Sequence, residues 1–239
     1  MTEIVIASAA RTPVGAFNGA FASLSAHALG TVAIKAAMER ARIEGAEVDE
    51  VILGQILAAG AGQNPARQAA LLAGLDAAVP AMTINKVCGS GLKTVMLAAQ
   101  AIKAGDLKVA VAGGMESMSN APYYLPTARS GMRLGHAQAI DGIVWDGLWD
   151  HYNNFHMGNT AELVAKKYEV SRADQDAYAA ESHRRAVAAQ QSGRFAAEIV
   201  SVELKGKKGE VTQFATDESP RADSTVEALS KLKPAFQKD

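Results

Sequence analysis

The chain has 239 residues, 49% of them hydrophobic, with a formal net charge of −1 and a single cysteine. This length and composition predict a folded protein of one large or two smaller domains rather than a disordered one. The balanced charge disfavours a nucleic-acid partner, because proteins that bind nucleic acid usually carry a basic surplus. One cysteine excludes an intrachain disulfide framework and fits a reducing compartment. No secretory leader and no apolar stretch of the ~20 residues that span a bilayer are visible, so we expect a cytoplasmic protein without a membrane partner.

Short apolar segments alternate with helical patterns in the first half of the chain. The expected strands cover residues 4–7, 48–56, 81–85 and 109–112. Between them we expect three helices: one capped by Ser25, one over 64–75 that starts with Asn64 and Pro65, and one over 92–104. This alternation predicts βαβ units and a mostly parallel sheet. The helix at 92–104 is apolar on nearly every side, which predicts burial all round.

The second half of the chain has a different character. Residues 117–150 are rich in Gly, Pro and Tyr and weakly periodic, a pattern typical of functional or interface-forming segments. The elements expected after it are helices at 160–168 and 171–191, the second capped by Ser171 and Asp174, strands at 199–204 and 211–214 around a basic turn at 206–209, and a short helix at 226–232.

The most informative residue is Cys88, which lies between the strand at 81–85 and the helix at 92–104. A helix N-terminus offers free N–H groups and the positive end of the helix dipole, which favour an anionic sulfur. Gly89 and Gly91 allow another backbone segment or a ligand to approach closely. Ligands of parallel sheets bind beyond the carboxyl ends of strands. A lone cysteine is more often a small buried hydrophobe, but this position favours a nucleophile whose base lies elsewhere in the sequence.

Other candidate sites are weaker. The glycines at 60–62 lack a phosphate-binding fingerprint and predict a turn. The lysines at 205–208 predict a solvated turn rather than an anion contact. Four histidines lack metal-ligand spacing, and no metal site is predicted: His27, His136, His151 and His183. By itself, His156 at a helix entry suggests a packed, hydrogen-bonded histidine rather than a ligand contact.

Several stretches in chain order resemble the thiolases, in particular the short-chain acetyl-CoA acetyltransferases. They are Ala10-Arg11-Thr12-Pro13, residues 85–93 around Cys88, residues 113–119, residues 156–162, Gln175-Asp176, Gly193-Arg194-Phe195 and residues 231–236. The resemblance implies an α/β fold of the thiolase type, with an N-terminal βαβ sheet half and an inserted loop domain that binds coenzyme A. It places the nucleophile-bearing domain at 1–118 and the loop domain, which also makes oligomer contacts, at 119–239.

The resemblance also implies a reaction. Two acetyl-CoA molecules condense to acetoacetyl-CoA, or the reverse thiolysis occurs, through an acyl-thioester on Cys88. The backbone N–H of Cys88 would stabilise the oxyanion. Coenzyme A takes part as substrate and product, and no permanently bound cofactor is expected. The contacts implied for substrate and coenzyme A are Leu148, His156 and Met157 near the acyl and pantetheine groups, Arg221 beside the nucleotide, and Phe236 on the pantetheine.

The same resemblance places the general base and a second catalytic cysteine of the family beyond residue 239. We therefore expect a chain without the C-terminal α/β half, weak or inactive in condensation alone, that forms a homo-oligomer or pairs with a C-terminal thiolase half. Two alternatives remain at this point. One is a condensing enzyme of the β-ketoacyl synthase type, and the other is a non-catalytic partner subunit.

Overall fold

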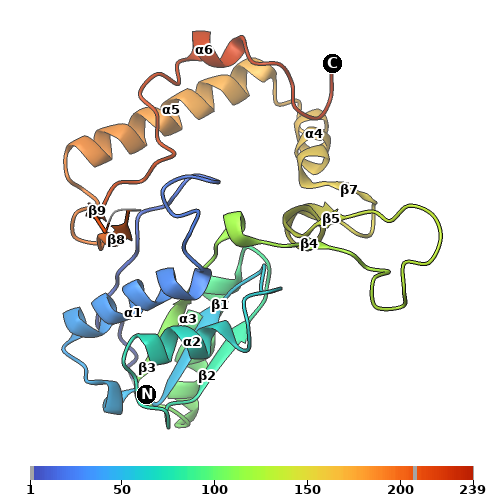
Figure 1. The fold of residues 1–239 in the computed structure, drawn as a ribbon. Coiled ribbons are helices and arrows are strands. Elements are labelled where there is room, and N and C mark those ends of the chain that lie inside the picture. Colours follow the sequence, from blue (N-terminus) through green and yellow to red (C-terminus); the bar gives the residue numbers. More distant parts are fainter. Residues whose placement is uncertain (1–2, 207–208, 239) are drawn as a thin grey trace. The chain divides into compact units, whose positions relative to one another are not determined.

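The computed structural model describes residues 3–206 and 209–238, which form two compact units (Figure 1). The first unit comprises Met1–Gly147 and Glu198–Ala215, and the second comprises Leu148–Ala197 and Thr216–Asp239. The domains expected from the sequence were divided by role, with the nucleophile in residues 1–118 and the coenzyme A contacts in residues 119–239. That division stays a prediction.

A three-stranded parallel sheet forms the centre of the first unit. Strand β1 (Glu50–Gly54) lies between β2 (Ala81–Ile84) and β3 (Ala110–Gly114). The register places Gly54 opposite both Ile84 and Gly114, so the carboxyl ends of all three strands meet at one edge. This arrangement confirms the parallel sheet expected from the sequence.

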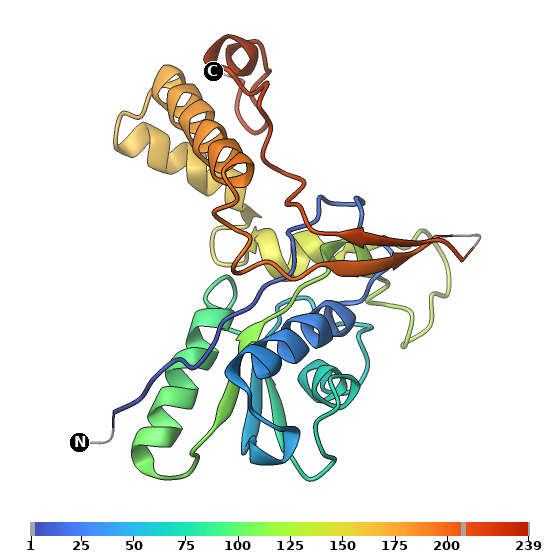
Figure 2. The same cartoon turned by 90° about the vertical axis from the view of Figure 1, so that its left-hand side faces the viewer.

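Three helices cover the two faces of this sheet. Helices α1 (Ala26–Ala41) and α2 (Pro65–Leu72) lie on one face, and α3 (Ser90–Ala104) lies on the other (Figure 2). The core between the sheet and the first two helices consists of Ala26, Ile34, Val48, Val51, Leu53, Ala66, Ala69, Ala70, Leu75, Val79 and Met115. Alternation along β1 directs its Ile52, only 2% exposed, toward the opposite face. The caps expected at Ser25 and Asn64 are confirmed, because each side chain accepts a backbone N–H of its helix.

One side of α3 is open, although the sequence pattern of this helix is apolar on nearly every side. Leu92 is 71% exposed, Met96 48% and Val95 37%. An all-apolar pattern predicts that both sides of a helix need cover. Within the described residues only the sheet side of α3 has it, as the resemblance implies for a chain without the second α/β half.

The strand expected at residues 4–7 is absent from the structure. These residues have no strand assignment, and Val5 and Ile6 are exposed to 71% and 78%. A short apolar run becomes a strand only when a neighbour completes its hydrogen bonds. Backbone and side-chain contacts fix the chain just beyond this segment instead. Arg40 donates to the carbonyl oxygens of Ala9 and Glu198, and the backbone of Arg11 forms an isolated parallel β-bridge with Ile199.

Shorter elements complete the first unit. They are η1 (Gly45–Glu47), η2 (Met118–Asn120), β4 (Tyr123–Tyr124), β5 (Ile140–Asp141), the π-helix η3 (Ile143–Leu148), β8 (Val202–Lys205) and β9 (Val211–Phe214). The hairpin of β8 and β9 confirms the two strands expected there, and Phe214 packs edge-on against Phe21 with ring centroids 5.2 Å apart. Residues 207–208 of the expected basic turn lie outside the described residues.

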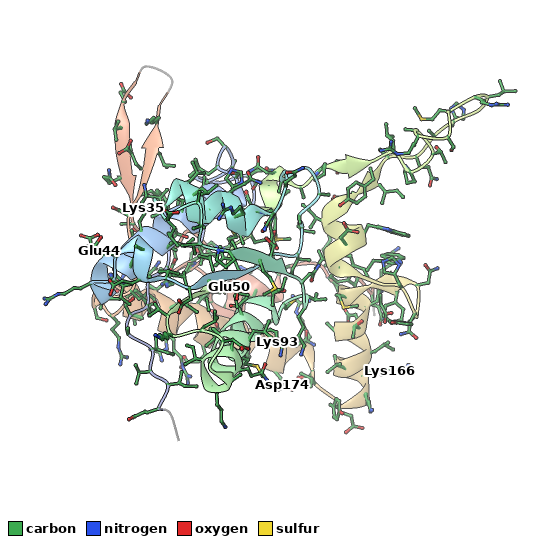
Figure 3. The ribbon with its side chains drawn as sticks, turned by 90° about the horizontal axis from the view of Figure 1, so that it is seen from below. Lys35, Glu44, Glu50, Lys93, Lys166 and Asp174 are labelled. Carbon is green, nitrogen blue, oxygen red and sulfur yellow. The ribbon has the colours of Figure 1, made fainter. Side chains whose placement is uncertain are left out.

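The second unit consists mainly of helices. Its elements are β6 (Trp149–Asp150), β7 (Phe155–His156), α4 (Met157–Lys167), α5 (Arg172–Gln191) and α6 (Val226–Ser230). The capping pair expected at Ser171 and Asp174 is confirmed, because each side chain bonds the other residue's backbone N–H. Figure 3 labels Asp174 in the first turn of α5 and Lys166 in the last turn of α4, where each charge complements the helix dipole. Across the described part of the chain, no helix combines the length and apolar character that crossing a membrane requires.

Candidate active site

Cys88 lies in a tight turn between β2 and α3, and its side chain is exposed. Val87, just before it, has a φ of 48°, a left-handed conformation that is strained for a β-branched residue. Two side chains hold this turn. Asn85 Oδ1 accepts the Val87 N–H at 2.8 Å, and Ser90 Oγ accepts the Lys86 N–H at 2.8 Å and donates to the Val87 carbonyl oxygen at 2.6 Å. Because Ser90 is only 4% exposed, its two bonds are partly shielded from water, and together with the exposed Asn85 bond they fix the backbone of the turn.

The start of α3 lies directly against the carboxyl end of the sheet. A Cβ on Gly54 would lie 2.5 Å from Ser90 Cβ, and one on Gly114 would lie 3.3 Å from Gly91 Cα. The fully buried Thr94 hydroxyl lies 3.0 Å from the Gly113 carbonyl oxygen and ties the first turns of α3 to β3. The missing side chains of these glycines therefore allow the close approach that brings Cys88 to the edge of the sheet.

Glu116 connects two loops at the same edge of the sheet. Its carboxylate accepts the backbone N–H groups of Ile56 at 2.8 Å and of Leu57 at 3.3 Å. Burial raises the pKa of the Glu116 carboxyl above its ordinary 4.5, and the bonds from the backbone partly oppose this shift. Gln55, the residue before Ile56, is only 3% exposed, and its Oε1 is buried without a hydrogen-bond partner among the described residues. No role for Glu116 or Gln55 was apparent from the sequence, although Glu116 lies in a stretch that resembles the thiolases.

In the second unit, His156 caps helix α4. Its Nδ1 accepts the Gly158 N–H at 2.9 Å, which fixes the neutral tautomer with the proton on Nε2. Phe236 stacks on the imidazole, with ring centroids 5.0 Å apart and an angle of 25° between the planes. A Cβ on Gly158 would lie 2.1 Å from the Phe236 ring, so only glycine leaves room for this stack. The expectation of a packed, hydrogen-bonded His156 is confirmed.

Two further predicted contacts lie beside His156. Met157, 39% exposed, is the first residue of α4. The half-buried Leu148 precedes Trp149, which pairs with His156 in the antiparallel ladder of β6 and β7. The second unit thus brings four of the predicted contacts into one neighbourhood through local pairing and one ring stack.

The fifth predicted contact, Arg221, lies elsewhere in the second unit. Its backbone N–H donates to His183 Nδ1 on α5 at 3.2 Å. Arg221 lines an open hollow of about 620 Å³ together with Arg184, Ser224 and other residues of α5 and of the segment that leads into α6. Arg184 is bonded to Glu181, which also lines the hollow, at 2.6 and 2.8 Å. The Arg221 guanidinium suits an anionic or planar ligand there. Cys88 belongs to the first unit, and these five contacts belong to the second.

No cluster of three or more His, Cys, Asp or Glu side chains suited to a metal ion occurs among residues 3–206 and 209–238. The arrangement around Cys88 defines an α/β protein with an exposed thiol at a rigid strand-to-helix turn, a geometry suited to nucleophilic chemistry.

Comparison with known proteins gives the family. Residues 4–239 match the family model described as "Thiolase, N-terminal domain". The chain is 56% identical to an acetyl-CoA acetyltransferase of Pseudomonas aeruginosa over 239 residues and 57% identical to one of Cupriavidus necator over 238. Each match covers 100% of this chain and 61% of the relative, so the chain spans about three-fifths of the length of these proteins. A probable acetyl-CoA acyltransferase of Staphylococcus aureus is 48% identical over the same share. The chain belongs to the thiolase family.

Proposed function

We propose that this chain provides the nucleophile and the coenzyme A contacts of an acetyl-CoA C-acetyltransferase. The observation that carries the proposal is the exposed thiol of Cys88, held at the carboxyl edge of a parallel sheet by the buried Ser90. The whole chain is also similar to proteins named acetyl-CoA acetyltransferase.

The proposed reaction has two steps. In the first, Cys88 Sγ attacks the carbonyl carbon of acetyl-CoA, the bond from that carbon to the coenzyme A sulfur breaks, and an acetyl-thioester forms as coenzyme A leaves. In the second, an acetyl-CoA that has lost a methyl proton to a base attacks this thioester. The new carbon–carbon bond gives acetoacetyl-CoA, and the Cys88 sulfur is the leaving group. Because the acetyl-enzyme is close in energy to acetyl-CoA, the first step is readily reversible. In the reverse of the second step, Cys88 Sγ attacks the ketone carbon of acetoacetyl-CoA, the carbon–carbon bond breaks, and the released carbon takes a proton back from the base, so the sequence also runs as thiolysis.

The proposed roles of the second unit follow from its contacts. Phe236, Met157 and Leu148 offer apolar surface to the pantetheine and acyl groups, and His156 Nε2–H offers a donor to a carbonyl oxygen. Arg221 and its hollow are assigned to the nucleotide, because guanidinium groups pair with phosphate and stack on a base. Coenzyme A is a substrate and product here rather than a bound cofactor.

We further propose that a C-terminal thiolase half covers the open side of α3. Leu92, Val95 and Met96 form this apolar side. The curated relatives extend well beyond the region they share with this chain, and the family's proton-accepting histidine is expected in that part. The exposed segment at 125–139, which includes the fully uncovered Leu134, is proposed as an oligomer contact.

The test supplies radiolabelled acetyl-CoA to the chain with and without the C-terminal portion of the Pseudomonas aeruginosa relative as a separate polypeptide. We expect label on wild-type protein, none on Cys88→Ala, and acetoacetyl-CoA formation only in the mixture. Failure of both chains to associate and to form product would contradict the catalytic proposal. Association without product would instead favour a partner subunit, and label supplied only by an acyl-carrier protein would favour a β-ketoacyl synthase.

A further inference from the structure

An ion pair with a buried carboxylate at the start of α5 has no role in the proposed chemistry. Arg172 Nε donates to both carboxylate oxygens of Asp176, at 2.9 and 3.0 Å. The two residues are one helical turn apart, and Asp176 is only 8% exposed. A solvent-exposed pair at this spacing has little effect on geometry. Here the carboxylate is removed from water, so the contact fixes the orientation of the guanidinium plane.

The other end of the same guanidinium holds a different segment. Arg172 Nη2 donates to the carbonyl oxygens of Leu229 at 2.7 Å and of Leu232 at 2.8 Å. These carbonyls belong to the end of α6 and the residues just after it, and the Leu229 carbonyl oxygen also accepts the Leu232 N–H at 3.0 Å. One side chain therefore joins α5 to a segment about 60 residues later in the chain.

This segment leads directly to Phe236. Four residues beyond Leu232 span at most ~14 Å, so the anchoring of Leu232 restricts where the Phe236 ring can lie. The ring is seated on His156 and over Gly158, where no side chain stands in its way. Phe236 is 47% exposed, so the face and edges not used by the stack are open to a ligand.

We infer that Arg172 is a positioning residue: oriented by Asp176, it holds the segment after α6 so that Phe236 stacks on His156. The inference rests on the proposed function in one respect, namely that the stacked pair borders the acyl-CoA site. Lysine cannot replace Arg172 in this role, because one ammonium group cannot serve the carboxylate and both carbonyl oxygens in a fixed plane.

The first test measures the stack without any assay of activity. In the full chain with 13C-labelled histidine rings, the ring current of Phe236 shifts the His156 C–H signals upfield, and the loss of these shifts in Phe236→Leu assigns them. We expect Arg172→Lys and Asp176→Asn to move the signals toward their position in Phe236→Leu. The matched control is Arg185→Gln, which removes the ion pair between Arg185 and Glu181, also on α5. The Arg185 side chain is 75% exposed. It should leave the signals in place.

The second test measures the affinity for coenzyme A by calorimetry. Arg172→Lys and Phe236→Leu should each weaken binding by about tenfold, roughly the 1.4 kcal/mol that a tenfold change represents. The double variant should lose no more than the single ones, because both changes act through one ring. Additive losses would contradict the inference.

The two tests separate this inference from the proposed function. Moved His156 signals in a chain that binds no coenzyme A would support the role of Arg172 and contradict the coenzyme A contacts. Unmoved signals in folded Arg172→Lys would overturn the inference whatever the affinity. If that variant does not fold, the wild-type chain decides: the Arg172 Nη2 protons should exchange with solvent much more slowly than those of Arg185, and equal rates would overturn the inference.

Discussion

Replacing Gly54 by alanine tests whether close packing of α3 on the sheet sets the position of Cys88. The new Cβ would lie 2.5 Å from Ser90 Cβ, 2.7 Å from the Ser90 carbonyl carbon and 2.8 Å from the Gly91 nitrogen. These neighbours are backbone atoms or fixed directly to them, so α3 itself must move. Overpacking of this kind costs about 1–3 kcal/mol, and the lower chain entropy of alanine in the unfolded state returns about 0.4–1 kcal/mol. We expect a net loss of about 1–2 kcal/mol.

The matched control is Gly113→Ala on the neighbouring strand. A Cβ there meets only a Leu53 methyl carbon at 3.8 Å, an ordinary contact, so we expect no loss and a gain of up to about 1 kcal/mol. Urea unfolding at a fixed pH measures both free energies of unfolding. The rate of Cys88 alkylation by iodoacetamide reports whether the conformation of the turn around Cys88 has changed. This rate should change in Gly54→Ala but not in Gly113→Ala. Equal stabilities and equal alkylation rates in the two variants would refute the reasoning.

Two further predictions concern titration. Burial and the hydrogen bond to Asp146 raise the pKa of Tyr124 to about 12, so its contribution to stability is full below the ordinary 10.0 and is lost as the pH rises through about 12. In an alkaline absorbance titration read against Tyr124→Phe, Asp146→Asn should lower this pKa, and an unchanged curve would contradict the assignment. Glu116 has a raised pKa, so the folded chain retains its proton more readily than the unfolded chain, and this contribution is lost as the pH rises above about 4.5. The stability of wild type relative to Glu116→Gln should therefore fall with rising pH, and a constant or rising difference would show the sign to be wrong.

Features decided by neighbours in the sequence could be predicted from it. The caps at Ser25, Asn64 and Ser171 depend on residues at most three positions away, and each is confirmed. The parallel sheet followed from the alternation of strand and helix. The place of Cys88 at its carboxyl edge followed from the same pattern.

Features decided by distant partners could not be predicted in this way. Residues 4–7 have the apolar character of a strand, but a strand also needs a partner, which no local pattern reveals. Glu116 bonds backbone groups 59 and 60 residues earlier in the chain, and Arg172 bonds carbonyls 57 and 60 residues later. Such contacts arise from topology and leave no spacing signal in the sequence.

The predicted coenzyme A contacts also combine local contacts with contacts between distant residues. His156 was expected at a helix entry, and the structure adds its tautomer, because Gly158 lies two residues away. Its stack with Phe236 joins residues 80 positions apart and needed the fold to be seen. The roles of these contacts in binding stay proposals.

Mass spectrometry of the chain after incubation with acetyl-CoA tests the central claim most directly. Cys88 should carry an acetyl group that hydroxylamine removes, as it does from thioesters. Iodoacetamide added beforehand should prevent the acetylation, and Cys88→Ala should remain unmodified. A chain that carries no acetyl group on Cys88, with or without the C-terminal portion of a relative, would contradict the assignment of this sulfur as the nucleophile.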